Sequence, residues 1–348
     1  MGNLRDEDIR QIVSDSNIPW ELLDGATVLV TGATGLVGGA LVRALSAANA
    51  HHGLSMRILG HGRDAAKGQQ LADVYGARFI AGDIREPLSI TGLSNHSCYM
   101  FHCASITKSA DMVAKPVDVI GTSVDGTRNM LELAREMECK SIVYVSSMEV
   151  YGQTGMHEVR EKDLGFLDLS NPRSSYPESK RLCESMCAAY AKQYDIPVKI
   201  VRLAQTFGAG TDKNDTRVFA QFARSAIAGN DIELHTEGKS RGNYCYTSDA
   251  VCALLTVLLK GRNGETYNAA NPAASMTIRQ MADLVANDVF DGKIKAVVNT
   301  PEDIDGRGYA PDVGYTLNVD KLMALGWTPK YGLDEMYRRL VADWQRAG

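Results

Sequence analysis

Residues 31–38 read Thr31-Gly32-Ala33-Thr34-Gly35-Leu36-Val37-Gly38, and this stretch decides the fold. It lies between an apolar run, 26–31, and a segment with helical periodicity, 36–47. In such a turn the first glycine permits the tight bend, the second lets the backbone approach a pyrophosphate, and the third lets helix and strand pack closely. The next helix offers amide donors and the positive end of its dipole to phosphate groups. The stretch therefore predicts a dinucleotide-binding site.

Apolar runs alternate with helical segments over the first part of the chain. The predicted strands are 26–31, 56–60, 77–82, 98–103, 141–147 and 198–203, and the helices between them include 36–47, 116–137 and 174–194. Several of these strands are continuous apolar runs, which is typical of parallel strands covered by helices on both faces. The alternation predicts an α/β protein with a Rossmann-type, doubly wound parallel sheet.

The same pattern divides the chain into three parts. Residues 1–25 read as an N-terminal extension with a short helix around 6–14, and residues 26–207 as the Rossmann domain that would hold NAD(P). The alternation of strands and helices then becomes less regular, so residues 208–348 are predicted to form a smaller C-terminal α/β lobe that would bind substrate. Some of its segments could return to the Rossmann sheet. This lobe is expected to contain helices at 217–228, 247–261, 278–288 and 333–346 and a strand at 232–238. A ligand is expected in the cleft between the lobes.

Composition and charge exclude several functional classes. The 348 residues are 45% hydrophobic with a net charge of −5, which is typical of a globular protein and leaves no basic surplus for nucleic acid. No apolar run approaches the roughly 20 residues of a membrane span. The polar start of the chain does not resemble a secretory signal, and the seven cysteines show no metal-binding spacing. We therefore expect a cytoplasmic protein without a metal, a nucleic-acid partner or a membrane partner.

Tyr176 and Lys180 form the most informative pair outside the glycine stretch. They are four residues apart, so on the predicted helix 174–194 they share a face. A lysine ammonium and an oxidised nicotinamide would both lower the pKa of a tyrosine hydroxyl from its usual value of about 10. Tyr176 could then accept a proton from a sugar hydroxyl while hydride leaves the same carbon. Ser147 ends the strand 141–147, at the edge where open α/β sheets place active sites, and could hydrogen-bond the same oxygen.

Three other residues each have more than one interpretation. No carboxylate occurs on the second strand before Asp64, although NAD-binding proteins of this fold use one for the ribose hydroxyls. Arg63 could contact a 2′-phosphate, which would favour NADP, or lie in solvent, so both NAD and NADP stay open. Asp83 could bind the adenine amino group or serve as a turn residue at the end of its strand. Glu149 could be a general base in the cleft or a solvated carboxylate.

The order of these motifs resembles the extended short-chain dehydrogenases/reductases, the family of NAD-dependent nucleotide-sugar epimerases and dehydratases. The resemblance covers most of 26–345. It rests on TGATGLVG (31–38), AGDI (81–84), FHCAS (101–105), YVSSMEVYG (144–152), Tyr176-x-x-x-Lys180, RLAQTFG (202–208), YCYTSDAV (244–251), GETYNAANP (264–272) and LGWTPKYGLDE (325–335). It implies a bound nicotinamide cofactor, a nucleotide-sugar substrate and a homodimer paired through two helices.

The resemblance also assigns roles to residues of this chain. The catalytic residues would be Ser147, Tyr176 and Lys180, with Glu149 in addition. The cofactor site would be lined by the glycine stretch and by residues at the ends of later strands. These further cofactor residues are Asp83, Ile84, Cys103, Ala104 and Ser105, with Arg63 on the reasoning above.

The substrate residues implied by the resemblance lie mostly in the second half of the chain. The segments SSMEVYG (146–152) and RSSYPESKRLCE (173–184) look closest to sugar 4,6-dehydratases and UDP-glucuronate decarboxylases. Glu149 matches the carboxylate that removes a C5 proton in the dehydratases, whereas Met148 replaces the acid before it. Gln205 stands where the family often has an asparagine that contacts the nucleotide sugar. Arginines that could clamp the diphosphate are Arg217 and Arg241, with Arg307 ranked behind them.

The family's chemistry is transient oxidation at the 4-hydroxyl with Tyr176 as base, and three outcomes are open after it. Hydride return to the other face gives epimerisation, proton removal by Glu149 gives elimination, and a β-carboxylate would leave as carbon dioxide. A reductase that consumes NADPH is the main rival among enzymes. A non-catalytic dinucleotide-binding regulator is the alternative from another class, and retention of the serine, tyrosine and lysine together argues against it.

Overall fold

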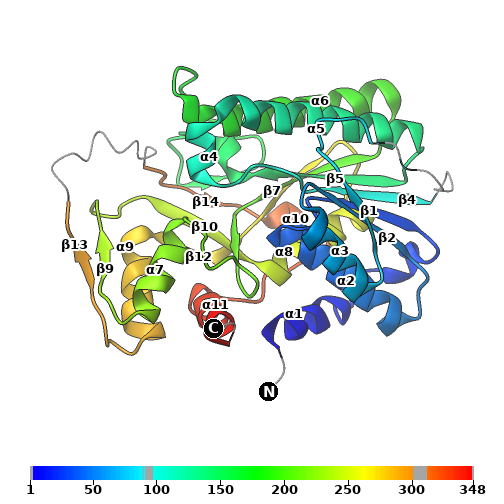
Figure 1. Ribbon diagram of the computed structural model, residues 1–348. Helices are drawn as coiled ribbons and strands as arrows, with labels where there is room; N and C mark the ends of the chain where they lie inside the picture. The colour runs from blue at the N-terminus through cyan, green and yellow to red at the C-terminus, as the bar shows by residue number, and fades with distance from the viewer. Residues whose placement is uncertain (1–2, 89, 91–96, 301–311, 347–348) are drawn as a thin grey trace.

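A seven-stranded parallel sheet forms the centre of the molecule (Figure 1). The computed structural model describes residues 3–88, 90, 97–300 and 312–346. The strand order is β11-β7-β5-β4-β1-β2-β3, and every neighbouring pair is parallel. The strands are β1 (Thr27–Thr31), β2 (Arg57–Gly62), β3 (Arg78–Ala81), β4 (Cys98–His102), β5 (Ser141–Ser147), β7 (Val198–Leu203) and β11 (Thr266–Ala269). The predicted Rossmann-type sheet is therefore confirmed.

Helices cover both faces of this sheet, as Figure 1 shows. One face carries α5 (Pro116–Glu136) and α6 (Ser175–Tyr194), and the other carries α2 (Leu36–His52), α3 (Ala65–Tyr75) and α8 (Thr247–Lys260). On β1, Leu29 packs into the α5/α6 core, whereas Val28 and Val30 pack into the α2/α8 core. Both sets of side chains are buried because neighbouring residues of a strand point to opposite faces, which explains the continuous apolar runs in the sequence.

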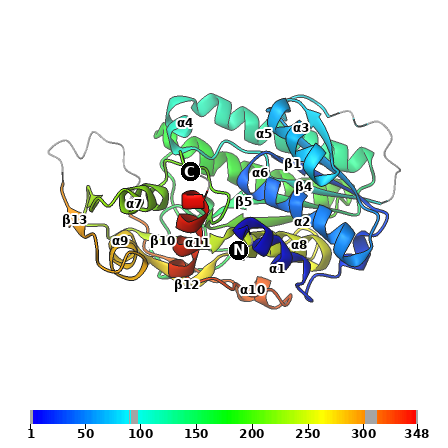
Figure 2. The same cartoon turned by 60° about the horizontal axis from the view of Figure 1, so that its bottom comes forward.

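The N-terminal residues form a helix that packs on the Rossmann domain. Helix α1 (Leu4–Val13) lies against α2 and α8 and is followed by a short 3-10 helix, η1 (Trp20–Leu23). Figure 2 shows α1 close to α11 (Leu333–Arg346), the last helix. The Arg5 guanidinium donates to both carboxylate oxygens of Asp343 at 3.0 and 2.9 Å, so α1 is bonded to α11 as well.

The second half of the chain contributes to both lobes. Helix α8 packs on β5 and β7, and β11 extends the parallel sheet beside β7. The smaller lobe has its own core between α7, α9, α11 and the short strands around them. Its elements are β8 (Gln205–Phe207), α7 (Val218–Ile227), β9 (Ile232–Leu234), β10 (Arg241–Tyr246), β12 (Asn271–Thr277), α9 (Ile278–Leu284), a π-helical turn (Val285–Val289) and β13 (Ala296–Val298).

Short elements complete the described chain. They are α4 (Ser109–Ala114), η2 (Met148–Tyr151), β6 (Glu158–Val159), η3 (Pro172–Ser174), β14 (Thr316–Leu317) and α10 (Asp320–Met323). The strand expected at 232–238 ends at Leu234, and Gly238 has φ of 68°, a turn conformation rather than an extended one. Among the described residues, no helix is long and apolar enough to cross a bilayer, and no group of three His, Cys, Asp or Glu side chains could hold a metal ion.

Candidate active site

A cleft of about 1030 Å³ opens at the carboxyl edge of the parallel sheet, between the two lobes. The residues proposed from the sequence that the structure describes all line it, from the glycine stretch to the arginines of the smaller lobe. Arg307 lies outside the described residues. The cleft also contains side chains that the sequence reasoning did not select, among them His61, Phe166, Arg173, Gln221 and Tyr315.

The glycine stretch forms a turn with no room for a side chain at Gly32 or Gly38. Gly32 has φ of 67°, and a Cβ atom on it would lie 2.9 Å from the backbone nitrogen of Ala104. A Cβ on Gly38 would overlap the carbonyl oxygen of Gly32. Gly35 is the N-cap of α2 and has no side chain to cap the helix. Backbone and helix N-terminus are therefore close to the cleft and suited to a pyrophosphate group.

Polar groups at the ends of β2 and β3 lie beside this turn. Asp83 accepts hydrogen bonds from the Arg85 guanidinium, the shortest at 2.8 Å, and these bonds are the main cause of its lowered pKa. Arg63 contributes to the same lowering through its charge. Ile84 is buried next to them. The Asp83 carboxylate thus stays ionised, although part of its acceptor capacity is already used by Arg85.

The end of β4 is fixed by a buried histidine. His102 Nδ1 lies 2.9 Å from the Thr31 hydroxyl, and Thr31 in turn accepts a hydrogen bond from the Ala104 backbone nitrogen at 3.2 Å. Burial lowers the pKa of His102 to about 3, so the imidazole is neutral. Burial also raises the pKa of Cys103 to about 12, which keeps this side chain a thiol. Cys103, Ala104 and Ser105 therefore form a neutral wall of the cleft.

Tyr176 and Lys180 face the cleft from the first turns of α6. The Lys180 ammonium donates to the carbonyl oxygen of Val145 at 2.8 Å and lies 5.8 Å from the centre of the Tyr176 ring. Burial lowers the pKa of Lys180. It raises the pKa of Tyr176 to about 12, and the nearby charge of Glu149 acts in the same direction, whereas the Ser147 hydroxyl opposes the rise. The hydroxyl of Tyr176 therefore carries its proton in the protein alone.

The carboxylate of Glu149 is paired with an arginine in the cleft. Glu149 lies on η2, directly after β5, where its backbone nitrogen donates to the Ser147 hydroxyl at 3.2 Å. Its carboxylate accepts a hydrogen bond from Arg173 at 2.7 Å, and the side chains are 38% and 23% exposed, respectively. The Arg173 guanidinium also lies 6.0 Å from the centre of the Tyr176 ring. An ion pair therefore adjoins the tyrosine. Its arginine is part of the RSSYPESK motif and could have been noticed there.

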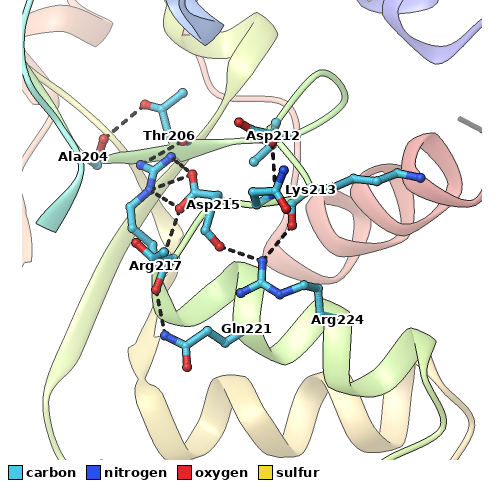
Figure 3. A network of polar contacts seen from close by, with 12 residues as sticks. Ala204, Thr206, Asp212, Lys213, Asp215, Arg217, Gln221 and Arg224 are labelled. Atoms are coloured by element: carbon cyan, nitrogen blue, oxygen red, sulfur yellow. Dashed lines mark hydrogen bonds and ion pairs between the residues drawn. The ribbon is translucent and has the colours of Figure 1, made fainter. Parts of the chain in front are cut away.

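The smaller lobe contributes the residues proposed for the substrate. Gln205 begins β8, Arg217 is the N-cap of α7, and Arg241 begins β10. Figure 3 shows the Arg217 guanidinium over Asp215, which accepts from it at 2.6 Å, while a second nitrogen lies 3.4 Å from the carbonyl of Thr206. Arg241 donates to the backbone carbonyl of Ser275 at 2.9 Å. Both arginines are therefore held in place by the protein itself.

A buried ion pair supports the floor of the site. Arg202 on β7 donates to both carboxylate oxygens of Glu184 on α6, at 2.9 and 2.6 Å. Ser146, the residue before Ser147, donates to the same carboxylate at 2.6 Å. The two charged side chains are only 5% and 11% exposed. Glu184 lies one helical turn after Lys180, and its bonds to Ser146 and Arg202 join α6 to β5 and β7.

Comparison with known proteins places these features in one family. Residues 28–270 match the model of the NAD-dependent epimerase/dehydratase family. The chain is 30% identical over 311 residues to UDP-glucuronic acid decarboxylase 6 of Arabidopsis thaliana, covering 88% of this chain and 85% of the relative. It is 32% identical over 257 residues to UDP-glucuronic acid decarboxylase 3 of the same plant, covering 74% and 71%, respectively.

Solved structures of similar fold include two enzymes with nucleotide-sugar substrates. UDP-glucose 4-epimerase of Thermotoga maritima, solved with UDP-glucose, has a TM-score of 0.75 at 21% identity over 92% of this chain and 99% of that one. DesIV, a dTDP-glucose 4,6-dehydratase of Streptomyces venezuelae solved with NAD, has a TM-score of 0.74 at 23% identity over 92% and 97%. The resemblance seen in the motifs is thus confirmed, and the chain belongs to the NAD-dependent epimerase/dehydratase family.

Proposed function

We propose that this enzyme modifies the sugar of a nucleotide sugar by transient oxidation at a hydroxyl group, with Tyr176 as the base. The observation that carries the proposal is that one cleft receives Tyr176 and Lys180 from the Rossmann lobe and Arg217 and Arg241 from the smaller lobe. A guanidinium is suited to a diphosphate, and a tyrosine–lysine pair to removing the proton of a hydroxyl group. The relatives named for UDP-glucuronic acid, UDP-glucose and dTDP-glucose support this substrate class.

The chain's own residues fit a nicotinamide dinucleotide. The glycine turn and the uncapped start of α2 suit the pyrophosphate, because a side chain on Gly32 or Gly38 would collide with neighbouring backbone. The neutral wall of Cys103, Ala104 and Ser105 would line the ring side of the site. When bound, the oxidised nicotinamide accepts a hydride and adds a positive charge near Tyr176.

The proton transfer is explained by the positions of three side chains. Lys180 is held by the Val145 carbonyl beside the tyrosine ring, so its ammonium stabilises a phenolate more than a phenol. The Ser147 hydroxyl acts to lower the pKa of Tyr176, and both hydroxyls line the cleft, where they can share the substrate oxygen. Tyr176 can then take the hydroxyl proton as the carbon loses hydride. General-base assistance of this kind contributes about 10²- to 10⁴-fold in rate.

Glu149 and Arg173 are the groups best placed to decide the reaction's outcome after oxidation. A ketone acidifies the neighbouring C–H, and Glu149 can take that proton once it exchanges its bond to Arg173. A nucleotide-linked uronic acid is the first substrate to test, because relatives that cover most of the chain are UDP-glucuronic acid decarboxylases. UDP-glucose and dTDP-glucose are the matched neutral sugars, since the structural neighbours are named for them.

The decisive experiment compares Tyr176→Phe and Lys180→Met with the parent enzyme on these three sugars, with products identified by mass spectrometry. We expect turnover to fall about 10²-fold or more in both variants while dinucleotide binding persists. Tyr194→Phe, at the exposed end of the same helix, is the control. Full activity in both variants would overturn the assigned chemistry. Stoichiometric oxidation of NADPH during turnover would instead favour a net reductase.

The proposal extends to assembly and location. Val117 and Ile120 on α5 and Leu182 on α6 are exposed apolar side chains on helices that pack side by side. We propose that these helices pair with a second copy in a homodimer. Light scattering on the parent and on Leu182→Glu would test this, with a monomer expected for the variant.

A cytoplasmic location is also part of the proposal, and imaging of the tagged protein in its own cells would test it.

A further inference from the structure

The carboxyl end of β2 lacks the acid that would favour NAD. Strand β2 lies beside β1, with His61 paired to Thr31 at the start of the glycine turn. In Rossmann proteins an acidic residue near this position binds the ribose 2′-hydroxyl, whereas an arginine accommodates a 2′-phosphate. Here the strand ends in His61 and Gly62, followed by Arg63, and all three line the cleft. His61 is buried and its pKa is lowered by burial, so it adds no charge.

The two carboxylates nearest to this end are already engaged. Asp64 is the N-cap of α3, and its side chain accepts a hydrogen bond from the Lys67 backbone nitrogen at 3.0 Å. Asp83 accepts several hydrogen bonds from Arg85. Arg63, in contrast, makes no hydrogen bond or ion pair within 3–88, 90, 97–300 and 312–346, although its charge acts on Asp83. Its exposed guanidinium is therefore available to a ligand in the cleft.

Gly62 leaves space between β2 and the glycine turn. A Cβ atom on Gly62 would lie 3.4 Å from the Thr34 hydroxyl and 3.5 Å from the Phe79 ring. The ribose of a dinucleotide bound at the glycine turn would lie in this region, because Thr34 belongs to that turn. These are ordinary van der Waals distances, so the surface beside Gly62 has room for a methyl group, which glycine leaves out. Gly62 therefore places no side chain between Arg63 and Thr34 of the glycine turn, and both Gly62 and Arg63 line the cleft.

We propose that this end of the cleft selects the 2′-phosphorylated dinucleotide, NADP(H), over NAD(H), and that Arg63 binds the 2′-phosphate. The proposal rests on the proposed function only in requiring a nicotinamide dinucleotide at the glycine turn. Arg63 supplies a planar donor fork for the phosphate oxygens. Strand β2 carries no carboxylate that would repel the phosphate.

The test measures equilibrium binding by calorimetry and needs no turnover. The ligands are NADP⁺ against NAD⁺, and 2′,5′-ADP against ADP as probes that lack the nicotinamide. We expect the parent to bind each 2′-phosphorylated ligand about 10- to 100-fold more tightly than the matching ligand without this phosphate. A gain of this size is typical of hydrogen bonds to a charged group. The preference should weaken with added salt. Arg63→Met should abolish it while leaving the affinity for NAD⁺ unchanged.

Two further variants make the result specific. Gly62→Asp introduces a carboxylate beside the glycine turn and should shift the preference towards NAD⁺. Arg262→Met is the control, because Arg262 is exposed on the loop before β11, at the opposite edge of the parallel sheet. Equal or tighter binding of NAD⁺ by the parent, unchanged in Arg63→Met, would overturn the inference and leave the proposed function standing. Failure of every variant to bind either dinucleotide would overturn both.

Discussion

Replacement of Glu184 by leucine should destabilise the protein strongly, although Glu184 does not touch the cleft. The change would leave the Arg202 guanidinium, 5% exposed, with a hydrogen bond to the Glu161 carbonyl but without its carboxylate partner, and would remove the acceptor of Ser146. Breaking a buried pair by removing one partner costs about 3–5 kcal/mol, because an uncompensated charge stays buried. For a protein whose total stability is on the order of 5–15 kcal/mol, this is a large fraction.

Urea unfolding followed by circular dichroism would measure this cost. With a slope on the order of 3 kcal/mol per molar urea, the midpoint should fall by about 1 M or more at unchanged slope. The double variant Glu184→Leu with Arg202→Met should be more stable than Glu184→Leu alone, since it removes the unpaired charge. Glu178→Leu is the control on the same helix, where a half-buried pair with Arg181 contributes about 1 kcal/mol or less.

Two results would refute this reasoning. One is a Glu184→Leu protein whose stability is within about 1 kcal/mol of the parent, which would mean that the buried pair contributes as little as a surface pair. The other is strict additivity of the two single changes in the double variant, which would show that the side chains are not coupled. Either result would also remove the basis for saying that this pair fixes α6, and with it Lys180, against the sheet.

Three other predictions address different parts of the molecule. Burial raises the pKa of Asp249 to about 6, so the folded state binds this proton more tightly than the unfolded state. The resulting contribution to stability is fully present below about pH 4 and should be lost as the pH rises through 6. Asp249→Asn should therefore flatten the pH dependence of the unfolding free energy between these values by up to about 3 kcal/mol. Asp343→Ala should release α1 by removing the acceptor of Arg5, seen as faster hydrogen exchange in α1, and unchanged exchange there would contradict it. Gly38→Ala should weaken dinucleotide binding measured by calorimetry, because the added carbon collides with the Gly32 carbonyl, and parent-like affinity would argue against that turn as the pyrophosphate site.

Most of the sheet could be predicted from the sequence because its signals are local. The glycine turn, the apolar strands and the helices between them each lie within one short segment. Strand β11 is not predicted in this way, and Asn268 explains why. It is a polar residue in a strand of four residues, yet it is fully buried, because its amide donates to the Asn318 carbonyl and accepts from the Tyr151 hydroxyl. Those partners are 50 and 117 residues away, so the short segment resembles a loop.

The sequence predicts which residues line the candidate site, but it does not predict which of their charged side chains form ion pairs. Spacing alone places Tyr176 and Lys180 on one helical face. No spacing rule joins Glu149 to Arg173, which lies 24 residues further along the chain and reaches it only after the loop between η2 and α6 folds back. The sequence suggests Arg217 as a clamp for the diphosphate, but it does not reveal the ion pair of Arg217 with Asp215. The pairing depends on side-chain conformation at the start of α7, and periodicity carries no information about it.

The way these residues are supported indicates which substitutions should abolish chemistry and which should redirect it. Tyr176 and Lys180 lie on a long helix anchored by a buried ion pair, so the oxidation step that we propose would rest on rigid secondary structure. Glu149 lies on a four-residue 3-10 turn, and its partner Arg173 lies on another short turn outside the sheet. Residues on turns and loops vary more readily without loss of the fold. The same proposed oxidation site could therefore be combined with different later steps, such as epimerisation, elimination or decarboxylation. Substitutions of Glu149 or Arg173 should change the product with the least effect on the rest of the fold.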